Sequence, residues 1–190
     1  MSIPDLDGEA VRTLLTELGN RLTAAGLRGE IFVVGGAAMA LVYDGSRTTT
    51  DIDAILKPRD LLLTEASAMA LTYNLPTNWL NDAVIQMLPN ELDECPRNIG
   101  EFGGLTVSVA SPQYLLALKA MVSRKSPADL DDAAKLCNAL GISDEMALEK
   151  IVQRYFGTGT VGAQELWFED IITQAICLMP NPQQLGTPTR

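Results

Sequence analysis

Residues 31–57 read IFVVGGAAMALVYDGSRTTTDIDAILK, and two short apolar runs within this stretch decide the fold. The first run, residues 31–34, is β-branched and aromatic, is too short for a buried helix and stops at Gly35-Gly36. The second run, residues 51–57, begins with alternating acidic and apolar residues and ends before a proline. The stretch therefore predicts two buried strands, joined by a short helix of small residues over 37–43.

Asp51 and Asp53 lie two positions apart in the second predicted strand. Strand side chains alternate between faces, so both carboxylates are expected on one face with their Cα atoms about 6.6 Å apart, while Ile52 and Ala54 face the core. Two like charges at this distance repel each other unless a cation lies between them, and hard divalent ions prefer oxygen ligands. The pair predicts a metal site; the alternative is a turn-ending Asp51 and a solvated Asp53.

The pattern around these strands predicts mainly helices. Helices are expected over 6–27, 59–73, 78–88 and 162–179, and at three further starts, Ser111-Pro112, Ser126-Pro127 and near Ser143. Asn78 is expected to cap the 78–88 helix, residues 89–104 to form a loop, and the alternating residues 105–110 to form a third strand. The sequence therefore predicts an α/β (α+β) protein with a small sheet flanked by helices.

The composition is that of one folded domain, with 190 residues, 47% of them apolar and 20% charged. The 14 basic against 24 acidic residues give a net charge of −10, which disfavours non-specific binding to DNA. No apolar run reaches the roughly 18 residues of a membrane span, and the first residues lack a signal-peptide pattern. These features predict a cytoplasmic protein without membrane contact.

The chain contains no histidine, and its three cysteines show no CxxC spacing. Metal sites built on histidine and Ser–His or Cys–His nucleophile pairs are therefore excluded. Any chemistry must use carboxylates, lysine, arginine and the backbone.

The order of Gly35-Gly36, Arg47-x-Thr49 and Asp51-x-Asp53 resembles the signature of the polymerase-β-type nucleotidyltransferase superfamily. More narrowly, it is similar to the minimal nucleotidyltransferases of the AbiEii/MenT-like toxin group. The resemblance implies that Gly35, Gly36, Arg47 and Thr49 bind the nucleotide, and that Asp51 and Asp53 hold Mg²⁺ or Mn²⁺. It also implies a sheet of the nucleotidyltransferase fold in residues 1–110, a helical part at 111–179 that completes the cleft, and a flexible tail at 180–190.

Two later segments extend the resemblance. Residues 79–83 look like a segment of close relatives, and Lys119 with Asp129 resembles the lysine and aspartate of helical motifs that the toxin group uses in catalysis. Without the resemblance, Lys119 is a rim residue whose aliphatic chain covers apolar surface, and Asp129 is the third helical residue of a capping box. Both interpretations of each residue stay open.

One departure concerns a third carboxylate, which the superfamily usually supplies from a later strand. Residues 105–110 contain none. Either Asp82, Glu101 or Asp129 serves instead, or metal binding is weakened, or catalysis has been lost.

The resemblance implies metal-dependent transfer of a nucleotide from an NTP to an acceptor hydroxyl. For the toxin group the acceptor would be tRNA, and the partner would be an antitoxin protein. Two alternatives are a catalytically silent module that binds a nucleotide or a partner, and a transferase that modifies an antibiotic or another small hydroxyl compound. The net charge of −10 fits a small acceptor better than tRNA.

Overall fold

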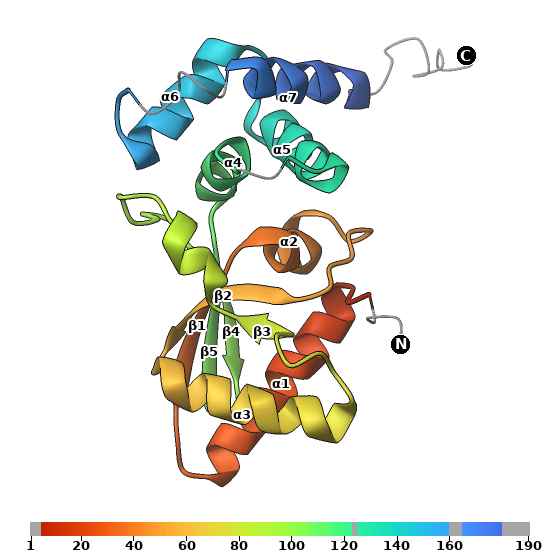
Figure 1. The fold of residues 1–190 in the computed structure, drawn as a ribbon, viewed down its shortest axis with the longest axis vertical. Coiled ribbons are helices and arrows are strands. Elements are labelled where there is room, and N and C mark those ends of the chain that lie inside the picture. The colour runs from red at the N-terminus through yellow and green to blue at the C-terminus, as the bar shows by residue number, and fades with distance from the viewer. Residues whose placement is uncertain (1–4, 123–124, 160–164, 180–190) are drawn as a thin grey trace, which may run out of the picture.

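The computed structural model describes residues 5–122, 125–159 and 165–179. Its centre is a five-stranded mixed sheet with the order β3-β2-β1-β5-β4, which confirms the predicted fold class (Figure 1). The strands are β1 (Gly29–Val33), β2 (Ile52–Lys57), β3 (Leu80–Asn81), β4 (Arg97–Phe102) and β5 (Leu105–Val109). β1 pairs antiparallel to β2 and parallel to β5, β2 pairs parallel to β3, and β4 pairs antiparallel to β5.

Helices make up most of the rest of the described chain. They are α1 (Gly8–Ala24), α2 (Gly35–Ala38), α3 (Arg59–Tyr73), α4 (Pro112–Ala120), α5 (Pro127–Leu140), α6 (Glu145–Phe156) and α7 (Glu165–Leu178), with a π-helical segment η1 (Met39–Tyr43) and a 3-10 helix η2 (Ala83–Met87). The predicted starts of α4 and α5 are confirmed, because the Ser111 and Ser126 hydroxyls accept the backbone N–H groups of Tyr114 and Asp129. Residues 180–190, the predicted tail, lie outside the described residues.

The predicted helix at 78–88 is wrong. Trp79 is fully buried and donates its indole N–H to the carbonyl of Ala66, 2.9 Å away on α3. The next two residues extend along the free edge of β2, where Leu80 pairs with Ile52. Because the unpaired edge of β2 and the buried indole hold the chain extended, only the short η2 remains helical in this segment.

The segment 89–104, predicted as a loop, contains β4. β4 forms a hairpin with β5 through Gly103-Gly104, and Gly103 has a φ of +59° that favours glycine. A register shift between Asn98 and Gly100 interrupts the alternation, and no residue of β4 is fully buried, so the sequence shows no clear strand pattern.

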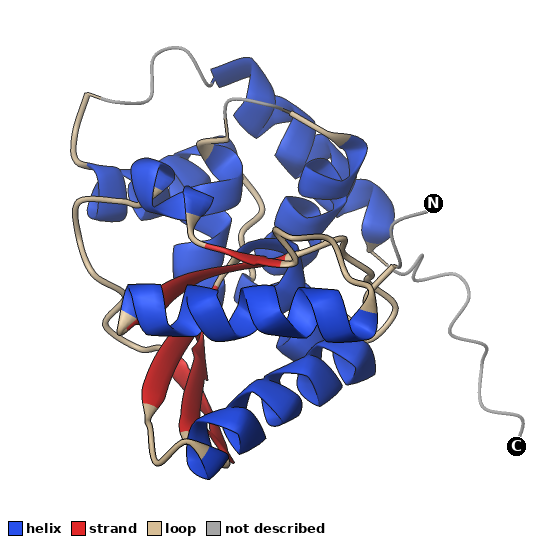
Figure 2. Cartoon of the chain, turned by 60° about the horizontal axis from the view of Figure 1, so that its bottom comes forward, coloured by secondary structure: helices blue, strands red, loops and turns tan. Residues whose placement is uncertain are grey.

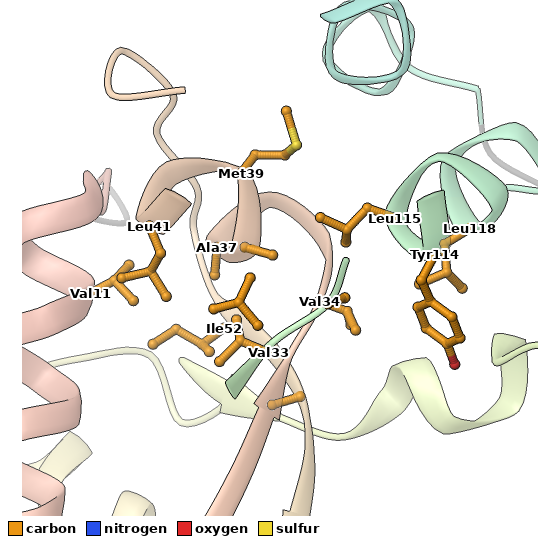
Figure 3. Close-up of a cluster of buried hydrophobic side chains, with 14 of the residues drawn as sticks. Val11, Val33, Val34, Ala37, Met39, Leu41, Ile52, Tyr114, Leu115 and Leu118 are labelled. Atoms are coloured by element: carbon orange, nitrogen blue, oxygen red, sulfur yellow. The ribbon is translucent and has the colours of Figure 1, made fainter. Parts of the chain in front are cut away.

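The helices pack on the sheet and on each other around one continuous core. α1 and α3 lie side by side against the sheet, and α4 to α7 gather beyond one of its ends (Figures 1 and 2). At the junction, Val34 after β1 faces Leu115 and Leu118 of α4 (Figure 3). Among the described residues, no helix has the length and apolar character needed to cross a membrane.

Candidate functional site

A cavity of about 580 Å³ lies where the C-terminal end of β1 and the N-terminal end of β2 meet α4 and the start of α5. Eight residues were predicted from the sequence to bind the nucleotide, hold metal or act in catalysis. All of them line this cavity: Gly35, Gly36, Arg47, Thr49, Asp51, Asp53, Lys119 and Asp129. The fold thus brings together four segments that are up to 94 positions apart in the sequence.

The glycine turn forms part of the cavity wall beside Asp53. The Val34 N–H donates to the carbonyl of Asp53 at 2.9 Å, so the chain leaves β1 next to the acidic strand. Gly35 has a φ of +64°, and a Cβ on it would lie 3.0 Å from Asp53 Oδ2. A Cβ on Gly36 would lie 2.9 Å from Thr49 Oγ1, so both glycines keep bare backbone against the cavity.

The loop before β2 is hydrogen-bonded to the segment that precedes α1. Leu6 and Thr49 exchange two backbone hydrogen bonds, of 2.7 and 2.9 Å, and the Thr49 hydroxyl donates to the carbonyl of Asp51 at 3.1 Å. This pairing places Asp5 in the cavity wall, a residue that the sequence gave no reason to single out.

The acidic pair is partly withdrawn from water. Burial raises the pKa of Asp51, although hydrogen bonds from the side chains of Asn81, Thr49 and Thr50 oppose the shift. Burial also raises the pKa of Asp53, and the nearby charge of Asp51 raises it further. The two carboxylates therefore repel each other in a partly dry site, which favours a cation between them.

Two cations line the cavity within an ionic network that reaches into α5. Lys119 donates to Asp129 Oδ1 at 2.7 Å and lies 2.9 Å from Asp132 Oδ2, and Arg47 Nε donates to Asp132 Oδ1 at 2.9 Å. The side chain of Asp132 is fully buried, with 0% exposure, and that of Lys119 is 7% exposed. Asp132 thus joins the two cavity cations, which shows that Lys119 is part of this buried network and not a rim residue.

Asp129 makes two kinds of contact, one with the helix cap and one with Lys119. The Ser126 hydroxyl donates to Asp129 Oδ2 at 2.6 Å and accepts the Asp129 N–H, as in a helix cap. The same carboxylate pairs with Lys119 in the cavity wall. Burial acts to raise the pKa of Asp129, but the charge of Lys119 and the hydrogen bonds outweigh it and hold the pKa below its usual range.

None of the three candidates for a third carboxylate completes a metal-ligand cluster. Asp82 pairs with Arg59, Glu101 is exposed on β4 at the far edge of the sheet, and Asp129 pairs with Lys119. In the described part of the chain, no three His, Cys, Asp or Glu residues are grouped to hold a metal. Two carboxylates still fit Mg²⁺, which proteins commonly bind through one or two carboxylates together with water and substrate phosphates.

Two polar residues that contact the site, Asn81 and Asp132, were not predicted from the sequence as site residues. Asn81 lies on β3, and its Nδ2 is 3.4 Å from Asp51 Oδ2. Asp132 follows Asp129 by three positions, on the same helix face, and this spacing was the available signal for it. The cavity also has an apolar wall that includes Val84, Met87 and Val122.

Comparison with known proteins agrees with this geometry. No curated protein and no solved structure matches the chain. A family model described as a nucleotidyltransferase of unknown function matches residues 10–165, which include every predicted site residue. The match supports the nucleotidyltransferase superfamily and leaves the narrower toxin group without support. The chain belongs to this family of nucleotidyltransferases of unknown function, DUF6036.

Proposed function

We propose that this protein transfers a nucleotide from an NTP to the hydroxyl of a small acceptor molecule, and that Asp51 and Asp53 hold Mg²⁺ or Mn²⁺ for the reaction. The observation that carries the proposal is the cavity, which combines a bare glycine turn, an acidic pair and two cations on its wall. Membership of a nucleotidyltransferase family supports the reaction class.

The chain's own residues have distinct tasks in this reaction. The bare backbone at Gly35 and Gly36 leaves room for the triphosphate to approach closely. As the acceptor oxygen bonds to the α-phosphorus, the bond to the β-phosphate oxygen breaks and pyrophosphate leaves. Arg47 and Lys119 are placed on the cavity wall to stabilise the charge that gathers on this leaving group.

The acceptor's proton passes to a carboxylate or to solvent, since the whole sequence contains no histidine. A divalent ion, when bound, would make the acceptor hydroxyl more acidic and neutralise phosphate charge. Asp51 and Asp53 are the residues that would hold it.

The charge of the cavity supports a small acceptor. Among the described residues that line it, Arg47 and Lys119 are the only cations, both have a task at the phosphates of the NTP, and the chain carries a net charge of −10. A long polyanion needs unpaired lysine and arginine along its path. A neutral or cationic hydroxyl compound therefore fits this site better.

Transfer to tRNA, as the toxin of a toxin–antitoxin pair, is the second candidate. One observation favours it: Lys125 is exposed directly before Ser126 of the cavity wall, where a phosphate backbone could reach it. The two candidates share the nucleotide site and differ only in the acceptor.

Labelled NTPs test the proposal. The protein is incubated with each α-³²P-labelled NTP, Mg²⁺ or Mn²⁺, and either total RNA or a panel of small hydroxyl compounds that includes aminoglycosides. We expect label on a small compound, and loss of at least about 100-fold of the rate in Asp51→Asn and Asp53→Asn, because the remaining carboxylate holds the ion poorly.

The matched control is Asp60→Asn, which removes an exposed carboxylate of α3 outside the cavity and is expected to keep full activity. Circular dichroism of all three variants checks that the fold is retained. Label on RNA alone would favour the toxin interpretation. Nucleotide binding without transfer to any acceptor would overturn the proposed reaction in favour of a silent binding module.

A further inference from the structure

Asn81 lies directly beside the acidic pair on the neighbouring strand. In the parallel pairing of β2 and β3, Asn81 is the register partner of Asp53 and Leu80 is the partner of Ile52. Leu80 and Ile52 are both buried, so Asn81 and Asp53 share the opposite face. The buried Trp79 and its hydrogen bond to Ala66 fix this register.

Three contacts determine which end of the Asn81 amide faces Asp51. Oδ1 accepts the backbone N–H of Ala83 at 3.0 Å, while Nδ2 lies 3.4 Å from Asp51 Oδ2 and 3.4 Å from the carbonyl of Asn78. A flipped amide would set oxygen against two acceptors and nitrogen against a donor. The amide therefore presents N–H groups to the carboxylates.

This orientation limits what the site offers to a cation. An amide oxygen can bind a hard divalent ion, but an amide N–H cannot. Within the described residues, no third His, Cys, Asp or Glu is grouped with Asp51 and Asp53 to hold a metal ion. Asn81 is not itself part of the cavity wall, so it acts on the cavity through Asp51.

From this geometry we infer that Asn81 is a positioning residue that makes the acidic pair a nucleotide-dependent metal site. The free protein holds a divalent ion weakly, and the ion becomes tightly bound only when the phosphates of the nucleotide supply the missing oxygen ligands. The inference rests on the proposed function, since it assumes that Asp51 and Asp53 hold the metal.

The first measurement is the affinity of the wild-type protein for Mn²⁺, determined by electron paramagnetic resonance. It is made without and with an α,β-methylene NTP analogue that cannot be cleaved. We expect Mn²⁺ to bind at least about tenfold more tightly with the protein and analogue together than with either alone, because additional anionic oxygens strengthen binding of a divalent ion. Equal Mn²⁺ affinity of the protein with and without the analogue would overturn the inference.

Asn81→Asp is the second measurement, because it replaces the N–H donor with a carboxylate at the same position. We expect this variant to bind Mn²⁺ without nucleotide at least about tenfold more tightly than the wild type. Its melting temperature should fall without metal and recover when Mn²⁺ is added, since three carboxylates repel one another when no cation is present. The control Asn78→Asp adds the same charge at an exposed position outside the cavity wall and should leave Mn²⁺ affinity unchanged.

The outcomes separate this inference from the proposed function. If the wild type binds Mn²⁺ with the analogue but Asn81→Asp gains no affinity for Mn²⁺ alone, the role of Asn81 is overturned and the metal site stands. If Mn²⁺ gains no affinity from the protein even with the analogue present, both proposals are overturned. If Asn81→Asp does not fold, Asn81→Ala takes its place as the second variant, and an Mn²⁺ affinity with the analogue equal to that of the wild type would overturn the role of Asn81.

Discussion

Gly36 lies on the cavity wall, next to the side chain of Thr49. A Gly-Gly pair after a strand can form a plain turn or a backbone that binds phosphate. The structure supplies the turn, through the positive φ of Gly35, and also places both residues on the cavity wall. Gly36 is the better position for a test, because its φ lies outside the left-handed region and a side chain there affects space more than backbone conformation.

We expect Gly36→Val to weaken binding of an uncleavable NTP analogue at least about tenfold. Its Cβ would lie 2.9 Å from Thr49 Oγ1 and 3.2 Å from Thr49 Cβ, and overpacking of this kind typically costs about 1–3 kcal/mol. Isothermal titration calorimetry measures the affinity, and circular dichroism shows whether the variant is folded. Gly45→Val is the control, since a Cβ on Gly45 would contact nothing within 4 Å. Unchanged affinity in a folded Gly36→Val protein would return the glycines to the plain turn interpretation.

At the scale of elements, α5 connects the helical part of the protein to the loop that carries Arg47. Asp132 pairs with Arg47, and Lys135, one turn later, pairs with Asp44 at 2.7 Å. The two ion pairs have opposite polarity, so one face of α5 is matched to two positions of the loop. The Lys135 and Ser46 side chains lower the pKa of Asp44 to about 2, which keeps this carboxylate charged.

Three aspartates of α5 are expected to differ in their contribution to stability. Asp132→Ala should cost about 3–5 kcal/mol, because it leaves Arg47 and Lys119 without their shared buried partner. Asp129→Ala should cost about 0.5–2 kcal/mol, because the Ser126 hydroxyl of the helix cap loses its acceptor while Lys119 keeps Asp132. Asp131→Ala should cost less than about 1 kcal/mol, because Asp131 forms a more exposed pair with Lys135. Urea unfolding of the three variants measures this order. An Asp132→Ala variant as stable as Asp131→Ala would contradict the assigned role of the network.

At the scale of the whole molecule, the sheet and the C-terminal helices share one hydrophobic core. The sequence suggested a boundary between residues 110 and 111, and the described residues pack continuously across it. Val34 faces Leu115 of α4 across this boundary (Figure 3), and Arg47 pairs with Asp132 of α5. The cavity is formed between the two parts, so its geometry depends on their joint stability.

We expect the two parts to unfold in a single transition. The chain has two tryptophans, one in each part: Trp79 packs beside α3, and Trp167 of α7 donates to the carbonyl of Lys119 at 3.2 Å. In Trp79→Phe the fluorescence of Trp167 reports on the helical part, and in Trp167→Phe the fluorescence of Trp79 reports on the part that contains the sheet. Each fluorescence midpoint should coincide with the midpoint from circular dichroism of the same variant, as for a two-state protein. A fluorescence midpoint of the helical part several degrees below the circular dichroism midpoint would instead show a separate domain.

The sequence by itself determined the elements whose signals are local. Apolar runs that end at glycine or proline predicted β1 and β2, Ser-Pro pairs predicted the starts of α4 and α5, and alternation predicted β5. The resemblance carried by the glycines, Arg-x-Thr and Asp-x-Asp also pointed to six residues that line the cavity, because these motifs consist of residue types at fixed spacing.

Only the tertiary structure decided what depends on partners far away in the chain. β3 lies where a helix was predicted, because its backbone pairs with the edge of β2 and the indole of Trp79 is buried against α3. β4 is a strand because its backbone pairs with that of β5. Asp132 and Asn81 gained their importance in the same way, one from two cations on other elements and the other from its register beside Asp53. Hydrogen bonds and ion pairs between distant segments depend on three-dimensional proximity, which local sequence patterns do not encode.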